Sequence, residues 1–203
     1  MAKVRSEKAG LPPGSLVPVS EVAAVATTIQ VFVYNADEVS ERCAVSPEMI
    51  ELGDPAKTVT WIDVAGLADL KAIKKIGEQF NLHQLLLEDV LNTDHRPTID
   101  EYQDQLFVVM KMLSSGAPEE EVQSEQISFV LGKGLVISFQ TCPGDVLEPV
   151  RERIRNDLGR IRQKGADYLR YSLLDVIVDN YYHIVEDLGA SLETMEMRIT
   201  QRP

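Results

Sequence analysis

The most constraining feature of this sequence is a regular apolar seam close to its C-terminal end. Large apolar side chains recur there at spacings of 4, 3, 4, 3, 4, 3 and 4 residues, and they are Leu174, Val178, Tyr181, Val185, Leu188, Leu192, Met195 and Ile199. A heptad repeat sustained over more than three heptads is typical of a long helix that offers one seam to another helix. At 1.5 Å per residue, a helix over about residues 167–200 is on the order of 50 Å long. A compact domain of this size is only ~30–35 Å across, so we expect the helix to project beyond it, as in a fragment of a larger protein.

The residues before this seam alternate between strand and helix patterns. The expected strands, rich in β-branched and aromatic residues, cover 28–34, 59–64, 106–113, 127–131 and 135–139. The expected helices, with apolar residues at spacings of three and four, cover 67–80, 84–91 and 145–158, the last capped by Asp145. A three-residue turn, Gly132-Lys133-Gly134, should join the last two strands. Residues 38–55 are ambiguous, with one short helix near 47–52.

This order of elements predicts the fold class. Strands in the front and middle of the chain, with helices between and after them, indicate an α/β (α+β) sandwich, in which a mixed β-sheet is flanked by helices. We expect a domain over residues 1–165, with an extended N-terminal arm around the Pro-rich segment 10–18, and a long C-terminal helix of coiled-coil character over 166–203.

Composition narrows the class of protein. Twenty Lys and Arg against 32 Asp and Glu give a net charge of −12, which would repel nucleic-acid phosphates. The longest uncharged stretch, residues 22–36, is 15 residues long and carries polar side chains, whereas a membrane-spanning helix needs about 20 mostly apolar residues. The charged residues 1–8 contain no apolar stretch, so we expect no secretory signal, and Cys43 and Cys142 form no C-x-x-C pair. As given, the chain is expected to be soluble, in a reducing compartment.

No catalytic motif is present in the sequence. It contains no G-x-G-x-x-G, no G-x-x-x-x-G-K, no G-x-S-x-G, and no pair of histidines at helical spacing. We therefore expect no enzymatic activity. The segment 151–170 holds seven basic residues against three acidic ones. It is either a nucleic-acid or lipid-headgroup surface, or a solvated helix face that pairs with acids elsewhere in the chain, and we favour the second.

Carboxylates are the more informative charged group. Asp175, Asp179, Glu186 and Glu193 fall within about 40° of one another around the long helix, and no Lys or Arg lies between Asp175 and Glu196. A second acidic cluster begins with Glu88 and Asp89, at the end of a short helix, where negative charge opposes the helix macrodipole. Both clusters suit a hard divalent cation such as Mg²⁺ or Ca²⁺. The alternative is that they are ordinary solubilising charges.

Several motifs in this order resemble one known family. They are Gly10-Leu-Pro-Pro-Gly14, Thr60-Trp-Ile-Asp63, Leu82-His-Gln-Leu-Leu-Leu-Glu-Asp-Val-Leu-Asn92, His95-Arg-Pro97, Ser124-Glu-Gln-Ile127, Val150-Arg-Glu-Arg-Ile-Arg155 and Ala166-Asp-Tyr-Leu-Arg-Tyr-Ser-Leu-Leu-Asp-Val-Ile-Val-Asp179. The chain resembles the cytoplasmic N-terminal domain of the CorA family of magnesium and cobalt transporters.

The resemblance implies a site and an assembly. By analogy, Glu88, Asp89, Asp175 and the Leu11 carbonyl would bind Mg²⁺, or Co²⁺ and other divalent ions, between subunits of a homopentameric channel and hold it closed. A further carboxylate, the stalk and the membrane helices would lie beyond Pro203. The full protein would then be an integral membrane protein with this domain on the cytoplasmic face of the cell membrane, and this piece alone could not transport. As a fragment it should be a monomer or a weak oligomer.

A second interpretation remains open. The chain could be a stand-alone soluble protein-interaction module that uses its projecting heptad helix, with the acidic residues incidental. Two apolar segments of about 20 residues each, found downstream of this sequence, would favour the interpretation as a channel domain.

Overall fold

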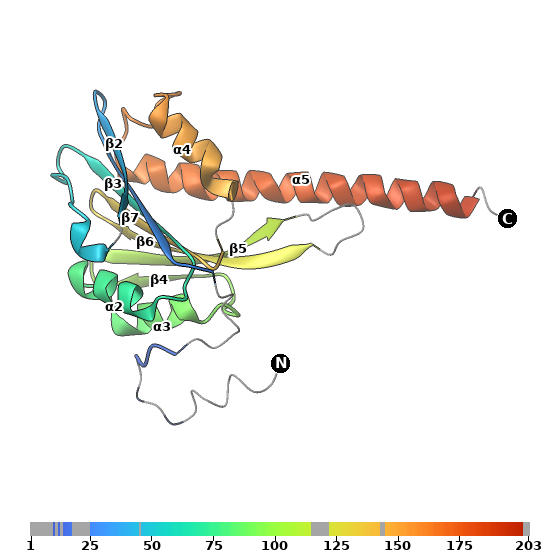
Figure 1. Ribbon diagram of the computed structural model, residues 1–203. Helices are drawn as coiled ribbons and strands as arrows, with labels where there is room; N and C mark the ends of the chain where they lie inside the picture. Colours follow the sequence, from blue (N-terminus) through green and yellow to red (C-terminus); the bar gives the residue numbers. More distant parts are fainter. Residues whose placement is uncertain are drawn as a thin grey trace.

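The computed structural model describes residues 10, 12, 14–17, 25–44, 46–114, 122–142 and 145–200. Within this part of the chain, a seven-stranded sheet lies between two layers of helices (Figure 1). The strands are β1 (Thr28–Tyr34), β2 (Val39–Ala44), β3 (Val59–Ala65), β4 (Thr98–Tyr102), β5 (Gln105–Ser114), β6 (Gln123–Gly132) and β7 (Leu135–Gln140). The helices are η1 (Pro47–Met49), α2 (Leu70–Gln79), α3 (Gln84–Leu91), η2 (Asp145–Leu147), α4 (Glu148–Arg155) and α5 (Ala166–Thr200).

The sheet is mixed, as the sequence predicts. Its strand order is β2-β1-β3-β7-β6-β5-β4, and β3 and β7 are parallel while the other neighbouring pairs are antiparallel. Antiparallel neighbours can be joined by tight turns, whereas a parallel pair needs a long crossover connection. Here α2, α3 and the strands β4 to β6 form that connection. The predicted sandwich class is confirmed.

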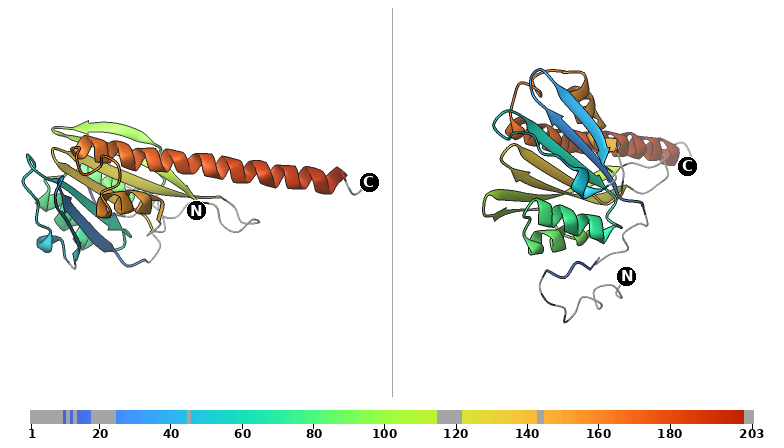
Figure 2. Two further views of the ribbon diagram at one scale, coloured as in Figure 1. Left: turned by 90° about the horizontal axis from the view of Figure 1, so that it is seen from above. Right: turned by 60° about the vertical axis from the view of Figure 1, so that its left-hand side comes forward.

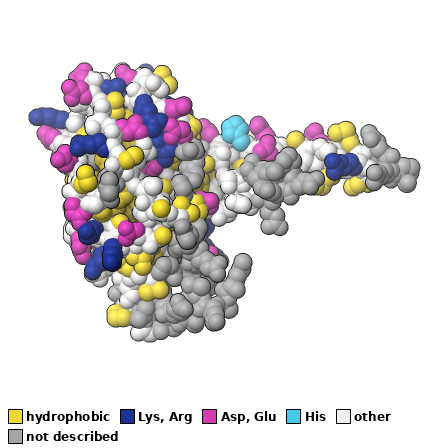
Figure 3. Space-filling view, viewed as in Figure 1, with side chains coloured by type: hydrophobic (Ala, Val, Ile, Leu, Met, Phe, Trp, Pro, Cys, Tyr) yellow, Lys and Arg dark blue, Asp and Glu magenta, His cyan; other side chains and the backbone are white. Residues whose placement is uncertain are grey.

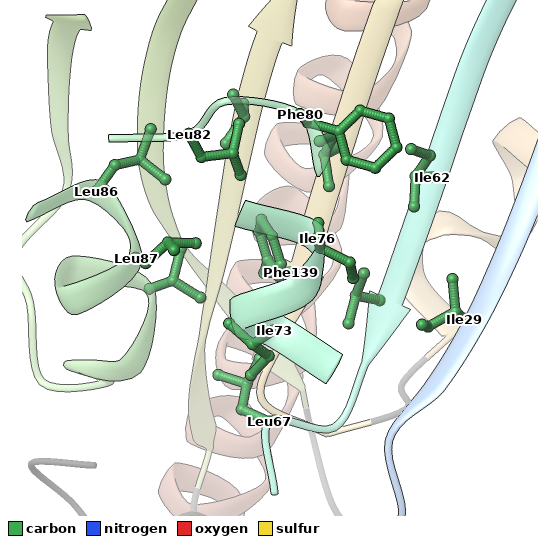
Figure 4. Packing of buried hydrophobic residues seen from close by; sticks show 14 of the residues in the cluster. Ile29, Ile62, Leu67, Ile73, Ile76, Phe80, Leu82, Leu86, Leu87 and Phe139 are labelled. Carbon is green, nitrogen blue, oxygen red and sulfur yellow. The ribbon is translucent and has the colours of Figure 1, made fainter. Parts of the chain in front are cut away.

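Both faces of the central strands are covered. Every residue of β3 is buried, which is typical of a strand packed on two sides. Ile62 and Val64 point to the face covered by α2 and α3, where the cluster in Figure 4 also contains Ile73 and Leu86. Trp61 packs on the opposite face, with residues of α4 and α5. Figure 2 shows the two helical layers on either side of the sheet.

Local signals fix the ends of α2 and α3. The Asp69 carboxylate accepts hydrogen bonds from the amides of Lys71 and Ala72, both at 3.0 Å, and caps α2. Asn81 then adopts a positive φ of 52°, the conformation that commonly ends a helix. His83 Nδ1 accepts from the Leu85 amide and caps α3. Because these signals are local, the sequence predicts the bounds of α3 correctly.

Helix α5 is 35 residues long and changes character along its length. Its N-terminal part, as far as Ile184, packs on the sheet through Leu169, Leu173, Ile177 and Ile184, all buried. Beyond this contact the helix runs past the sheet edge (Figures 1 and 2), and its apolar side chains are exposed at Val185, Leu188, Leu192, Met195 and Ile199. The predicted projecting helix is confirmed. We retain the division of the chain at residue 165 as a proposal.

Several local predictions differ from the structure. The sequence does not predict strands β2 and β4, because neither shows a regular alternation of apolar and polar residues; each is an edge strand that pairs on one side only. The β6–β7 turn is Lys133-Gly134, and Gly132 belongs to β6. The helix expected over 145–158 is shorter, since α4 begins at Glu148 with Leu147 in the capping position. The ambiguous segment contains β2 and the 3₁₀ helix η1.

A buried ion pair joins α4 to the sheet. Arg151 Nη2 and Asp63 Oδ2 are 2.6 Å apart, and their side chains are 7% and 3% exposed. The other carboxylate oxygen, Asp63 Oδ1, accepts hydrogen bonds from Ser138 at 2.6 Å and Gln140 at 2.8 Å. Ser138 in turn accepts from the Trp61 indole at 2.9 Å. The buried charge of Asp63 is therefore compensated by one cation and two neutral donors.

Replacing Arg151 by alanine should destabilise the fold strongly. The substitution leaves Asp63 buried without its cation, which typically costs about 3–5 kcal/mol. Urea denaturation at pH 7 would measure the loss, with Arg160→Ala as control, because Arg160 is exposed and should change the free energy of unfolding by less than about 0.5 kcal/mol. Equal stability of the two variants would contradict the account of the ion pair.

Candidate functional site

Glu88 and Asp89 lie in the last turn of α3, and both are half-buried. The helix buries Leu86, Leu87, Val90 and Leu91 in the core beneath the sheet. The two carboxylates occupy the remaining helix face, at the rim of that core. Negative charge at a helix C-terminus is unfavourable, and it becomes favourable when a cation binds there.

Glu88 also contacts the N-terminal arm. Its Oε2 atom accepts a hydrogen bond of 2.7 Å from the Gly14 amide, 74 residues away in sequence. Gly14 has a φ of +83°, and a side chain there would collide with Gln84 at 2.9 Å. A glycine is therefore needed where the arm approaches α3. Leu11, whose carbonyl was expected to bind metal, lies outside the described residues.

Asp89 is held by contacts from two other elements. Its carbonyl accepts from Gln126 Nε2 of β6 at 3.2 Å. Its carboxylate lies 3.7 Å from His95 Nε2, with both side chains 28% exposed. The pKa of Tyr102 is raised, first by burial and then by the negative charges of Asp89 and Asp100. Sequence reasoning missed the contacts to His95 and Gln126, because no local pattern signals them.

Asp175 lies on α5, which packs on the other face of the sheet from α3 (Figure 2). It is half-buried, and its hydrogen bond with the Tyr171 hydroxyl is the main reason that the pKa of Tyr171 is raised. Further along the same helix, Asp179, Glu186 and Glu193 are exposed. The sequence therefore places the acidic stripe correctly on the surface of α5.

The predicted metal-binding residues do not meet within one chain. Glu88 and Asp89 belong to the α2–α3 layer, and Asp175 belongs to the α4–α5 layer. In the described part of the chain, no group of three or more His, Cys, Asp or Glu side chains could hold a metal ion. The oxygen donors suit a hard cation, but a site that combines all three residues would have to form between two copies of the chain.

Three of the seven basic residues in the segment 151–170 form ion pairs in the described part of the chain. Arg151 bonds to Asp63 and Glu148, Arg155 to Glu41 and Glu148, and Arg170 to Asp167. For Arg151 and Arg155 the expectation of pairing with acids elsewhere in the chain is confirmed, whereas Arg170 pairs within the segment. Arg162 donates instead to a backbone carbonyl, that of Asn35, at 3.1 Å.

The fold is that of the soluble domains of CorA-type proteins. The structure matches the soluble domain of CorA from Methanocaldococcus jannaschii with a TM-score of 0.67 and 17% identity, covering 88% of this chain and 66% of that one. It also matches the full-length CmaX protein, with a TM-score of 0.71 and 16% identity over 87% of this chain and 53% of the other.

Sequence comparison gives the family. The chain belongs to the family of CorA-like Mg²⁺ transporter proteins, whose profile matches residues 56–203. It is 38% identical over 198 residues to the cobalt/magnesium transport protein CorA of Thermotoga maritima, covering 98% of this chain and 56% of that protein. The putative metal ion transporter YfjQ of Bacillus subtilis is 26% identical over 136 residues, 67% of this chain and 41% of that protein. The resemblance drawn from the motifs is confirmed.

The chain spans about half the length of these curated relatives. Among its described helices, none is both long enough and apolar enough to cross a lipid bilayer. The relatives are named as transporters rather than enzymes.

Replacing Glu88 by alanine should release the arm from α3. The lost bond joins a charged acceptor to an amide, and such bonds contribute about 1.5–3 kcal/mol when buried; this one is only partly buried, so we expect about a tenfold faster hydrogen exchange over residues 14–17. Mass spectrometry of exchanged peptides would measure it. Glu152→Ala, on an exposed position of α4, is the control. Unchanged exchange in Glu88→Ala would show that other contacts hold the arm.

Proposed function

We propose that this chain is the regulatory, non-catalytic domain of a divalent-cation channel for Mg²⁺, with Co²⁺ as a second ion. Its role is to sense intracellular Mg²⁺ through carboxylates at subunit interfaces. Membership of the CorA-like family and the names of the relatives support the ion class. The observation that carries the regulatory part is the placement of Glu88 and Asp89 on one face of the domain and Asp175 on the other.

Placement on two different faces suits a ring of identical subunits. In a ring each subunit contacts its two neighbours through different surfaces, so one subunit's Glu88 and Asp89 can meet the next subunit's Asp175. Every interface then brings several carboxylates together. Two close carboxylates repel by about 1–4 kcal/mol at effective dielectric constants of 80–20, and a bound dication reverses the sign.

This arrangement couples the ion to the conformation. If the closed ring brings the carboxylates together and the open ring separates them, the closed state binds more metal and is stabilised by it. A fall in intracellular Mg²⁺ empties the sites and loosens the ring, which opens the pore. The full protein would be a homopentamer in the cell membrane, with this domain on its cytoplasmic face and the pore formed by residues beyond 203.

A second candidate function rests on the exposed seam of α5. Val185, Leu188 and Leu192 are 65%, 49% and 62% exposed, and a helix with such a seam could bind a partner protein as a stand-alone module. The family match favours the channel domain, because it covers residues 56–203 and thus includes α5 itself.

Metal binding by the isolated chain should be weak and should depend on Asp89. Each subunit offers only a few carboxylates, and these hold Mg²⁺ loosely. We therefore expect a dissociation constant on the order of millimolar for Mg²⁺ and tighter binding of Co²⁺. Asp89→Lys places a fixed cation at the site and should abolish the response in calorimetric or thermal-shift titrations. In the full-length channel the same variant should mimic the bound, closed state.

The control for this titration is Glu152→Lys, which changes the net charge equally at an exposed position on the opposite face. Asp89 would be only a solubilising charge if Asp89→Lys kept its metal response. The same conclusion would follow if only Glu152→Lys lost the response. Flux through the full-length channel at varied internal Mg²⁺ tests the regulatory step.

The isolated chain should be a monomer or a weak oligomer at micromolar concentration. Its net charge of −12 opposes association, and millimolar Mg²⁺ should shift it toward larger species. Sedimentation velocity with and without Mg²⁺ would test this, with Leu188→Gln to separate association through the α5 seam from association through the carboxylates. A stable pentamer without metal would contradict the prediction.

A further inference from the structure

A cavity of about 330 Å³ lies at the end of the sheet where α5 begins. Four parts of the chain line it: the end of β1 with the two residues after it, residues 55–59 up to the start of β3, Gly134 of the β6–β7 turn, and residues 162–166 up to the start of α5. In Figure 1 the start of α5 lies at the end of the molecule opposite to the helix's C-terminal tip. None of the carboxylates of the proposed metal site lines it.

The charge of this cavity is opposite to that of the chain. Its lining includes Lys57, Arg162 and Lys164, and no described lining residue is acidic. A second cavity, also bordered by Gly134, has the acidic residues Glu101, Asp104 and Asp167 in its wall. Lys57 forms an ion pair of 3.6 Å with Asp54, but its side chain is 79% exposed, and such exposed pairs are weak. The cavity is therefore a local region of positive charge in a chain whose net charge is −12.

Two of the donors around the cavity are fixed in place. Arg162 Nε donates to the Asn35 carbonyl at 3.1 Å, which holds the guanidinium and leaves its terminal nitrogens to act as a fork. The amides of Tyr168 and Leu169 donate to the Gly165 carbonyl, so α5 starts at the cavity wall. The first amides of a helix have no acceptor within the helix, and they carry the positive end of its dipole.

Tyr34 supplies a further, independent observation. It lines the cavity and is only 1% exposed, yet its hydroxyl has no hydrogen-bond partner among the described residues. Burial raises the pKa of Tyr34, so the hydroxyl remains a proton donor. A buried polar group without a partner is unfavourable. The charged side chains that line the same cavity are Lys57, Arg162 and Lys164, which are all donors, so the component that the cavity lacks is an acceptor.

We propose that this cavity binds a small phosphate-type oxyanion, either free phosphate or a phosphate monoester. Arg162 would bind two of its oxygens, Lys57 and Lys164 would neutralise its charge, and the amides at the start of α5 and the Tyr34 hydroxyl would donate to it. The volume is at the lower end of the range of about 300–1,000 Å³ for small-molecule sites, which suits a phosphate with a small organic group.

Titration of the 203-residue chain with inorganic phosphate, at constant ionic strength set by chloride, tests the proposal. Isothermal calorimetry and the thermal unfolding midpoint should both report binding. Arg162→Gln and Lys164→Gln should each weaken it, by about tenfold for the arginine. Arg160→Gln is the matched control, because Arg160 is exposed in the same segment and does not line the cavity. If Arg162→Gln fails to fold, Lys164→Gln still decides, since Lys164 is exposed.

Tyr34→Phe gives a second readout that a purely structural role would not produce. Without phosphate the variant should be at least as stable as the wild type, because it removes a buried hydroxyl that lacks a partner. With phosphate it should bind several-fold more weakly. Absence of binding to the wild type at tens of millimolar phosphate, or equal affinity in wild type, Lys164→Gln and Tyr34→Phe, would overturn the proposal.

A parallel titration with glycerol 3-phosphate distinguishes the two sources of the anion. Tighter binding than that of inorganic phosphate identifies a phosphate monoester as the ligand class, and equal or weaker binding identifies free phosphate. In either case Lys164→Gln and Tyr34→Phe should weaken binding of the ligand as they weaken binding of inorganic phosphate.

Discussion

The structure depends on the burial of the central parallel pair, β3 and β7, from both sides. A parallel pair cannot be closed by a tight turn, so the chain between its strands forms a long connection, and the helices of that connection, α2 and α3, cover one face of the sheet. Helices α4 and α5 cover the other face. Figure 3 shows the resulting molecule, a rounded body from which α5 extends, with acidic and apolar side chains along it.

The polar network around Asp63 lies within this buried centre. Trp61, Ser138 and Gln140 come from the parallel pair, and Arg151 comes from α4. An ionised carboxylate at this depth is tolerated only with good partners, and Arg151, which lies on α4, supplies the cation. The network thus joins α4 to the two central strands of the sheet. Helix α5 is the next helix after α4, separated from it by residues 156–165, and packs on the same face of the sheet.

The two-layer arrangement also determines what the carboxylates can do. Glu88 and Asp89 are presented on one side of the sheet and Asp175 on the other, so their joint action belongs to an assembly rather than to a single chain. The basic cavity at the start of α5 and the acidic stripe along its surface give one helix two opposite electrostatic environments. Both environments can exist on the long helix α5, because exposed charges more than about 10 Å apart are largely screened from each other.

The sequence by itself determined the elements whose signals are local. The bounds of α3, the length of α5 and the strands β1, β3 and β5 follow from periodicity, caps and apolar runs, and the order of the motifs identified the family. Only the tertiary structure placed the edge strands β2 and β4, whose sequences show no regular alternation of apolar and polar residues. It alone joined Glu88 to Gly14, set Asp175 on the opposite face, and brought Tyr34, Lys57 and Arg162 around one cavity. These relations join residues far apart in the chain, and they are decided by which faces the sheet buries, which no short stretch of sequence records.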